Sequence, residues 1–157
     1  MKIKLVMVGK TTDAELVKLI ENYRKRLTHY VNFETSIIPE IKNAKSLTFD
    51  QLKEKEGELL LDKFEVNDEI ILLDEKGKQL SSVQFANFLS DKMLYSAKNV
   101  TFVIGGAYGF SDKVYKKANS LLSLSVMTFS HQMIRLLFTE QLYRAMTIIK
   151  GEPYHHE

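Results

Sequence analysis

The chain has 157 residues, 45% hydrophobic and 27% charged, as expected for one soluble globular domain spanning 1–157. It contains no cysteine, which excludes disulfides, thiolate nucleophiles and Cys-ligated zinc. The net charge is +2, with Lys and Arg outnumbering acids by 7 to 3 in residues 1–30 and by 6 to 4 in residues 99–157. These basic ends are compatible with binding a phosphate backbone, and equally with a solvated surface helix.

We expect no targeting signal in the amino-terminal segment. Residues 1–9 are too short and too alternating for a signal peptide, and no apolar run approaches the length of a membrane span. We therefore expect a cytoplasmic protein that does not contact a membrane.

The first half of the chain alternates between strand and helix patterns. Residues 2–8 form an apolar strand pattern, and a capping box at Thr12 opens a helix that continues to about residue 30. Residues 33–38 alternate as a second strand, and a further capping box opens a helix over 48–64.

The second half continues the alternation and ends in a long helix. Its predicted elements are, in order, a strand over 69–74 closed by a turn at 75–78, a helix over 81–95, a strand over 100–104, a short helix over 111–118, a strand over 121–127 and a helix over 130–150. The strands are mostly apolar rather than half polar, which favours burial on both faces. We predict an α/β fold with an open, mostly parallel sheet and helices on both faces.

The last helix is apolar nearly all round and carries little polar surface. Such a helix needs cover on more than one side, which a small domain can hardly provide for a terminal element. We therefore expect a homodimer that buries part of it.

A glycine-rich turn, Gly105-Gly-Ala-Tyr-Gly109, follows the apolar strand over 100–104. Open α/β sheets bind ligands at such strand ends, where backbone amides are exposed. The pattern lacks the spacing of a dinucleotide fingerprint, so a structural turn explains it as well as a ligand turn does. If the strands are parallel, the ends at Leu73, Gly105 and 124–129 converge on one crevice suited to a nucleoside-type cofactor.

The histidines do not form a metal-binding pattern. His155 and His156 are adjacent, without the spacing of metal ligands or a partnering carboxylate pair, so we expect no metal. Glu140 and Arg144 lie one helical turn apart, which predicts an ion pair within the helix.

Several separated strings, in this order, resemble the ribosomal RNA large subunit methyltransferase H family of the SPOUT superfamily. They are Phe102-Val-Ile-Gly-Gly-Ala-Tyr-Gly-Phe110, Leu122-Ser-Leu-Ser-Val-Met-Thr-Phe-Ser-His-Gln132, Glu140-Gln-Leu-Tyr-Arg-Ala145 and Pro153-Tyr-His155. The resemblance covers essentially the whole chain. It departs mildly at Ala107-Tyr108 and at Ser130, positions that concern substrate detail rather than reaction class.

The resemblance implies S-adenosyl-L-methionine-dependent methylation of N3 of pseudouridine 1915 in helix 69 of 23S rRNA, within the assembled ribosome. It also implies a homodimer with a C-terminal trefoil knot, a feature that no sequence pattern predicts. The implied cofactor residues are Leu73, Gly105, Leu124, Ser125, Val126, Met127, Thr128 and Phe129. The implied residues on the RNA side are Arg144, Tyr154 and His155.

The chemistry would require removal of the N3 proton, because N3 lies between two carbonyls and is protonated at neutral pH. His155 is a candidate proton acceptor, Arg144 a candidate stabiliser of the imide anion, and Tyr154 a candidate for stacking on the base. We expect the active site to be completed across the dimer. Phosphate contacts are expected from basic side chains, namely Lys10, Arg24, Lys25 and Arg26.

Two other functions are compatible with the sequence. One is a SPOUT methyltransferase that acts on another RNA, such as tRNA. The other is a non-catalytic ribosome-binding factor that keeps the fold without the chemistry, although the intact glycine turn and the Tyr154-His155 ending argue against it.

Overall fold

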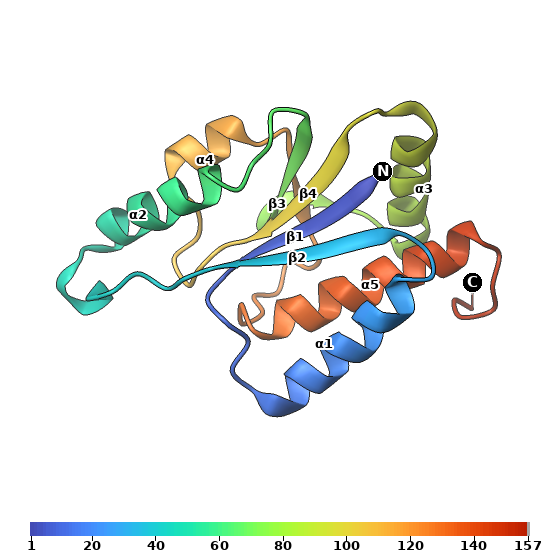
Figure 1. Ribbon diagram of the computed structural model, residues 1–157, viewed down its shortest axis with the longest axis horizontal. Coiled ribbons are helices and arrows are strands. Elements are labelled where there is room, and N and C mark those ends of the chain that lie inside the picture. Colours follow the sequence, from blue (N-terminus) through green and yellow to red (C-terminus); the bar gives the residue numbers. More distant parts are fainter. Residues whose placement is uncertain (157) are drawn as a thin grey trace.

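The computed structural model describes residues 1–156, which form one five-stranded sheet with helices on both faces (Figure 1). The strand order is β2-β1-β4-β3-β5, and every neighbouring pair is parallel. The strands are β1 (Lys2–Val8), β2 (Asn32–Ile38), β3 (Asp68–Gln79), β4 (Asn99–Ile104) and β5 (Ser120–Ser123). The predicted fold class is therefore confirmed.

The helices follow the strands in regular alternation. They are α1 (Ala14–Leu27), the short 3-10 helix η1 (Ala44–Ser46), α2 (Phe49–Leu61), α3 (Ser82–Tyr95), α4 (Asp112–Lys117) and α5 (Met133–Ile149). Thr48 and Ser81 form the predicted capping boxes of α2 and α3, and Ser111 caps α4. The predicted cap of α1 is wrong by one residue, because Asp13 and not Thr12 accepts the first backbone N–H groups.

The two faces of the sheet bury separate apolar cores. On β1, Ile3, Leu5 and Met7 face the core under α1, α3 and α5, whereas Val6 and Val8 face the core under α2 and α4. Strands buried on both faces explain why their sequences lack polar alternation. No helix within residues 1–156 has the length and apolar character that a membrane span requires.

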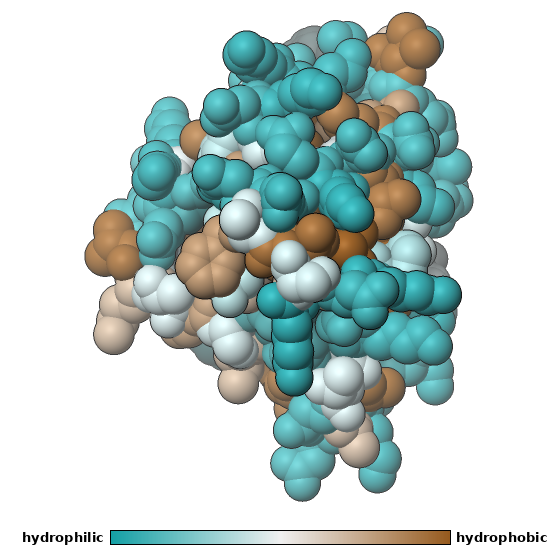
Figure 2. Space-filling view, turned by 90° about the vertical axis from the view of Figure 1, so that its left-hand side faces the viewer, coloured by the Kyte–Doolittle hydropathy of each residue, from teal (hydrophilic) through white to brown (hydrophobic). Residues whose placement is uncertain are grey.

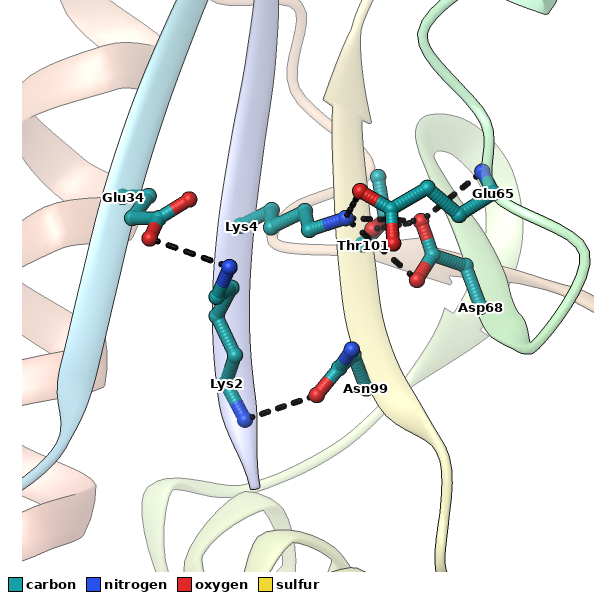
Figure 3. A network of polar contacts seen from close by, with 7 residues as sticks. All are labelled: Lys2, Lys4, Glu34, Glu65, Asp68, Asn99 and Thr101. Atoms are coloured by element: carbon teal, nitrogen blue, oxygen red, sulfur yellow. Dashed lines mark hydrogen bonds and ion pairs between the residues drawn. The ribbon is translucent and has the colours of Figure 1, made fainter.

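A polar network occupies the α2 and α4 face of the sheet near the start of the strands (Figure 3). Nζ of Lys4 on β1 lies 3.2 Å from Oδ2 of Asp68 on β3 and 2.6 Å from Oε1 of Glu65. Thr101 on β4, between them, donates its hydroxyl to the same Asp68 oxygen at 3.0 Å. The ammonium and the carboxylate are almost fully buried, so the hydrogen bonds between them offset their desolvation.

The strand bounds differ from prediction at β3 and β5. The residues predicted as a turn, 75–78, belong to a longer β3, which bends between Leu73 and Lys78 and pairs with β5 on both sides of the bend. β5 ends at Ser123, so residues 124–127, predicted as strand, lie in the loop that leads to α5. Both differences arise because residues on either side of the bend pair with the same short strand, a long-range contact that local periodicity does not report.

α5 packs between α1 and α3 within a single chain (Figure 1). Phe138, Leu142 and Ala145 are fully buried against the sheet. Its other apolar residues, among them Leu136, Leu137 and Ile148, are only half-buried, so the expected homodimer that covers part of this helix stays a prediction. Its first residue, Met133, is 39% exposed, and Val126 and Met127 in the preceding loop are exposed as well.

Candidate functional site

A cavity of about 610 Å³ opens at the bend of β3 and at the ends of β4 and β5. Three segments that are distant in sequence form its walls, namely 73–76, 104–110 and 122–131. Figure 2 faces the side of the molecule toward which β1 and β2 run, and apolar surface lies in the middle of this face among mostly hydrophilic side chains. The cavity therefore occupies the edge at which parallel α/β sheets bind ligands.

The glycine turn after β4 forms one wall, and Gly105 and Gly106 within it have no room for a side chain. A Cβ on Gly105 would lie 3.0 Å from the Phe110 ring, and one on Gly106 would lie 2.5 Å from Oε2 of Glu56. Gly109 has a φ of 87°, which L side chains rarely adopt, and its N–H donates to O of Gly106 at 3.2 Å. The turn thus presents backbone to the cavity.

The opposite wall depends on a close approach between β3 and β5. A Cβ on Gly77 would lie 2.6 Å from the backbone C of Leu121 and N of Leu122. The Thr128 hydroxyl donates to Oε2 of Glu75 at 2.7 Å and joins the loop before α5 to the bend of β3. The bend and the loop therefore form one connected rim.

The structure brings together most of the residues that the resemblance assigns to the cofactor. Leu73 lines the cavity from the bend of β3 and Gly105 from the end of β4, and the loop after β5 contributes Leu124, Ser125, Met127, Thr128 and Phe129. Val126 does not line it and is 73% exposed, because the loop turns this side chain outward.

Sequence reasoning missed an acidic group in the same wall. The Tyr115 hydroxyl of α4 donates to Oδ2 of Asp74, and Oδ1 of Asp74 accepts from the backbone N–H of Lys76 at 2.8 Å. Burial, together with the hydrogen bond to Asp74, raises the pKa of Tyr115 above its ordinary value. Asp74 directly follows an apolar strand, and this position in the sequence is the signal that could have identified it.

The residues assigned to the RNA side form a second cluster at the other end of α5. Arg144 donates Nη2 to Oε1 of Glu140 at 2.6 Å, and the Tyr154 hydroxyl donates to the same oxygen at 2.9 Å. Nη1 of Arg144 lies 3.1 Å from Nδ1 of His155, and its guanidinium carbon lies 4.7 Å from the centre of the Tyr154 ring. The predicted ion pair between Glu140 and Arg144 is therefore confirmed, as part of a larger cluster.

Hydrogen bonding within this cluster determines the protonation of its members. The hydrogen bond to Glu140 raises the pKa of Arg144, so the guanidinium keeps its charge. Burial and the hydrogen bonds to Tyr23 and Glu140 raise the pKa of Tyr154, so the phenol keeps its proton. A guanidinium only donates, so Nδ1 of His155 is the acceptor in this contact.

The cavity and the second cluster are separated within one chain. Ile134 lines the cavity, whereas Arg144 lies ten residues further along α5. At 1.5 Å per residue this separation is about 15 Å along the helix axis. Arg144, Tyr154 and His155 do not line the cavity. No group of three or more His, Asp or Glu within residues 1–156 is placed to hold a metal ion.

The sequence matches the family model described as predicted SPOUT methyltransferase over residues 1–155. The chain belongs to the SPOUT methyltransferase family. Relatives named ribosomal RNA large subunit methyltransferase H include those of Parabacteroides distasonis and Flavobacterium johnsoniae, both 56% identical over 157 residues and aligned over 100% of both chains. The relative of that name from Bacteroides thetaiotaomicron is 53% identical over the same length.

Among solved structures, the SpoU methyltransferase AviRb from Streptomyces viridochromogenes aligns with a TM-score of 0.47 and 10% identity. The alignment covers 95% of this chain and 58% of that one. A likeness of this size carries no argument about the fold or its ligand.

Proposed function

We propose that this protein uses S-adenosyl-L-methionine to methylate N3 of pseudouridine 1915 in helix 69 of 23S rRNA. The observation that carries the proposal is the convergence of Leu73, Gly105 and the loop 124–129 on one cavity. Full-length relatives named as large-subunit ribosomal RNA methyltransferases support the RNA substrate and a cytoplasmic location.

The residues of the cavity fit this cofactor. Leu73, Ile104 and Leu122 give an apolar surface for an adenine ring, and the turn at Gly105 leaves backbone polar groups for its edge. The carboxylates of Asp74 and Glu75 lie in the same wall, where a cationic sulfonium would be favoured. When bound, the cofactor would supply an electrophilic methyl group that needs no metal.

The cluster around Arg144 supports a role in deprotonating and stabilising N3. In the present contact the guanidinium holds Nδ1 of His155. We infer that a bound base draws Arg144 to one of its imide oxygens, where the positive charge stabilises the anion. Nδ1 of His155 is then available to accept the N3 proton, while the Tyr154 ring orients the base.

A homodimer would bring the cavity of one subunit next to the Arg144 cluster of the other. About 15 Å of helix separates Arg144 from the cavity wall, so one chain cannot offer both to the same base. Exposed apolar side chains beside the cavity, namely Val126, Met127, Phe129 and Met133, supply a surface for a second subunit. The tail of one subunit would then meet the cavity of the other. Sedimentation equilibrium giving the mass of a single chain would contradict this arrangement.

A trefoil knot is the proposed connectivity of the C-terminal part. This proposal comes from the family resemblance; in the structure Leu122 pairs with both Leu73 and Lys78, so the bend 74–77 lies beside β5. A chain pulled from its two ends in optical tweezers would then stop short of its full contour length. Complete extension would contradict the knot.

The decisive assay is transfer of tritiated methyl to ribosomes, compared with naked rRNA and with ribosomes whose RNA lacks pseudouridine. Mass mapping of the product identifies the nucleoside. Label at N3 of pseudouridine 1915 is expected, and only in assembled ribosomes. Label found in tRNA would show that the substrate is tRNA and not 23S rRNA. Cofactor binding without any methyl transfer would indicate a non-catalytic ribosome-binding factor.

A further inference from the structure

An exposed aromatic pair lies at the rim of the cavity. The rings of Phe49 and Tyr108 are stacked with centroids 4.0 Å apart and an interplanar angle of 20°. Phe49 is 62% exposed and Tyr108 is 47% exposed. Tyr108 lines the cavity, whereas neither ring belongs to either of the two apolar cores. Core packing therefore does not explain the pair.

Both rings are held in place by their local backbone. Phe49 is the first residue of α2, directly after Thr48, whose capping box fixes the start of the helix. Tyr108 lies inside the turn that Gly106 and Gly109 close. The stack is therefore preformed, so a planar ligand that binds to it would lose little additional side-chain entropy.

Positive charge is available close to the pair. Lys53 lies one helical turn after Phe49 on α2, on the same face of the helix, and its ammonium forms an exposed ion pair with Asp50 at 3.4 Å. Lys76 lines the cavity that Tyr108 also lines. An aromatic surface between ammonium groups suits a ligand that combines flat rings with phosphates.

We propose that Phe49 and Tyr108 form a stacking platform for an unpaired nucleobase of the RNA substrate, next to the base that is methylated. The inference rests on the proposed function only for the presence of RNA at this cavity. Nucleobases stack on aromatic side chains wherever RNA is single-stranded or its bases are turned out. Lys53 and Lys76 would contact the phosphates on either side of that base.

Fluorescence anisotropy with labelled decauridylate, compared with a sugar-phosphate strand of equal length without bases, tests the platform directly. Phe49→Ala and Tyr108→Ala should each weaken binding of decauridylate roughly 5- to 150-fold, as expected for the loss of one stacked base. Binding of the abasic strand should not change. Phe49→Trp and Tyr108→Phe keep an aromatic face and should retain the affinity.

The matched control is Tyr95→Ala, because Tyr95 is 84% exposed at the end of α3, away from the cavity. Decauridylate bound no better than the abasic strand, or unchanged affinity in both alanine variants, would overturn the proposal. Calorimetric titration showing that the variants weaken only S-adenosyl-L-methionine binding would overturn it too, by making the pair a cover for the cofactor.

The methyl-transfer assay and the binding assay test the two proposals independently. If the protein methylates ribosomes but binds decauridylate no better than the abasic strand, only the stacking platform is refuted. If the protein binds decauridylate through Phe49 and Tyr108 but transfers no methyl group, only the proposed methyltransferase function is refuted.

Discussion

Arg135, at the start of α5, donates Nη2 to the carbonyl oxygen of Val8 at the end of β1, at 2.7 Å. Its Nη1 donates to O of Gly9 at 2.8 Å and to the Thr11 hydroxyl at 3.0 Å. The side chain is fully buried, and this burial lowers its pKa. A single guanidinium thus joins the first strand to the last helix.

Loss of this guanidinium should weaken the fold. We expect Arg135→Met to lower the free energy of unfolding by about 2–4 kcal/mol, because the carbonyls of Val8 and Gly9 lose buried donors. Urea denaturation followed by circular dichroism measures the change. Lys18→Met, on the exposed surface of α1, is the control and should change stability by under about 0.5 kcal/mol. Equal stability of the two variants would contradict the structural role of Arg135.

Gly77→Ala should disrupt the wall of the cavity. The new Cβ would meet backbone atoms of Leu121 and Leu122 at 2.6 Å, and backbone cannot yield as a flexible side chain can. We expect a loss of about 1–3 kcal/mol in stability and loss of cofactor binding in a calorimetric titration. Gly151→Ala, with open space around its Cβ and a φ of 70°, should cost only about 1–2 kcal/mol and leave cofactor binding intact.

Glu56→Gln should make the protein more stable at neutral pH. Burial and the nearby Glu40 carboxylate raise the pKa of Glu56 above its ordinary 4.5. The folded chain therefore holds this proton more tightly than the unfolded chain, and the penalty for ionising it develops as the pH rises through the folded pKa. Below about 4.5 the carboxyl is protonated in both states.

The advantage of Glu56→Gln over wild type should therefore shrink as the pH falls and vanish in acid. Urea titrations across this range, with the exposed Glu58→Gln as a control on the same helix, measure it. A stability advantage of Glu56→Gln that grew in acid would contradict the raised pKa of Glu56.

Glu140→Gln should slow catalysis without affecting the cofactor. The carboxylate holds both Arg144 and Tyr154, so it positions residues proposed to act on the base. We expect kcat to fall about 10- to 100-fold while the Kd for cofactor stays constant. Glu69→Gln, which removes an ion pair between the start of β3 and Lys92 of α3, is the control. A changed cofactor Kd with unchanged kcat would refute the assignment.

Single-turnover methylation should separate the roles of Arg144 and His155. His155→Ala should lose rate at neutral pH and recover part of it in alkali, because hydroxide can replace the proton acceptor. Arg144→Ala should lose rate, about 10²-fold or more, at every pH, because the charge that stabilises the anion is gone. Unchanged rates in both variants would eliminate the two residues from the mechanism.

Much of the fold was predictable from sequence because local signals agreed with the final structure. The apolar runs of β1 and β4 and the capping boxes at Thr48 and Ser81 each describe contacts within a few residues. The extension of β3 past Leu73 was not predictable, since it depends on pairing with β5 some fifty residues later.

The candidate site was likewise predictable only where local sequence determines the structure. Glycine at 105 and 106 identified a turn, but only the tertiary structure showed that Glu56 fills the space where a side chain would be. The burial of Arg135 was also not apparent, because the carbonyls it satisfies lie at the opposite end of the sequence.

The order in which the walls of the cavity occur along the chain has a consequence for biosynthesis. The wall at Leu73 leaves the ribosomal exit tunnel well before the loop 124–129 that faces it, so a nascent chain has no pocket until almost all of it has been translated. Ligand affinity would then arise in one late step, and truncations before residue 124 would produce chains that never acquire it.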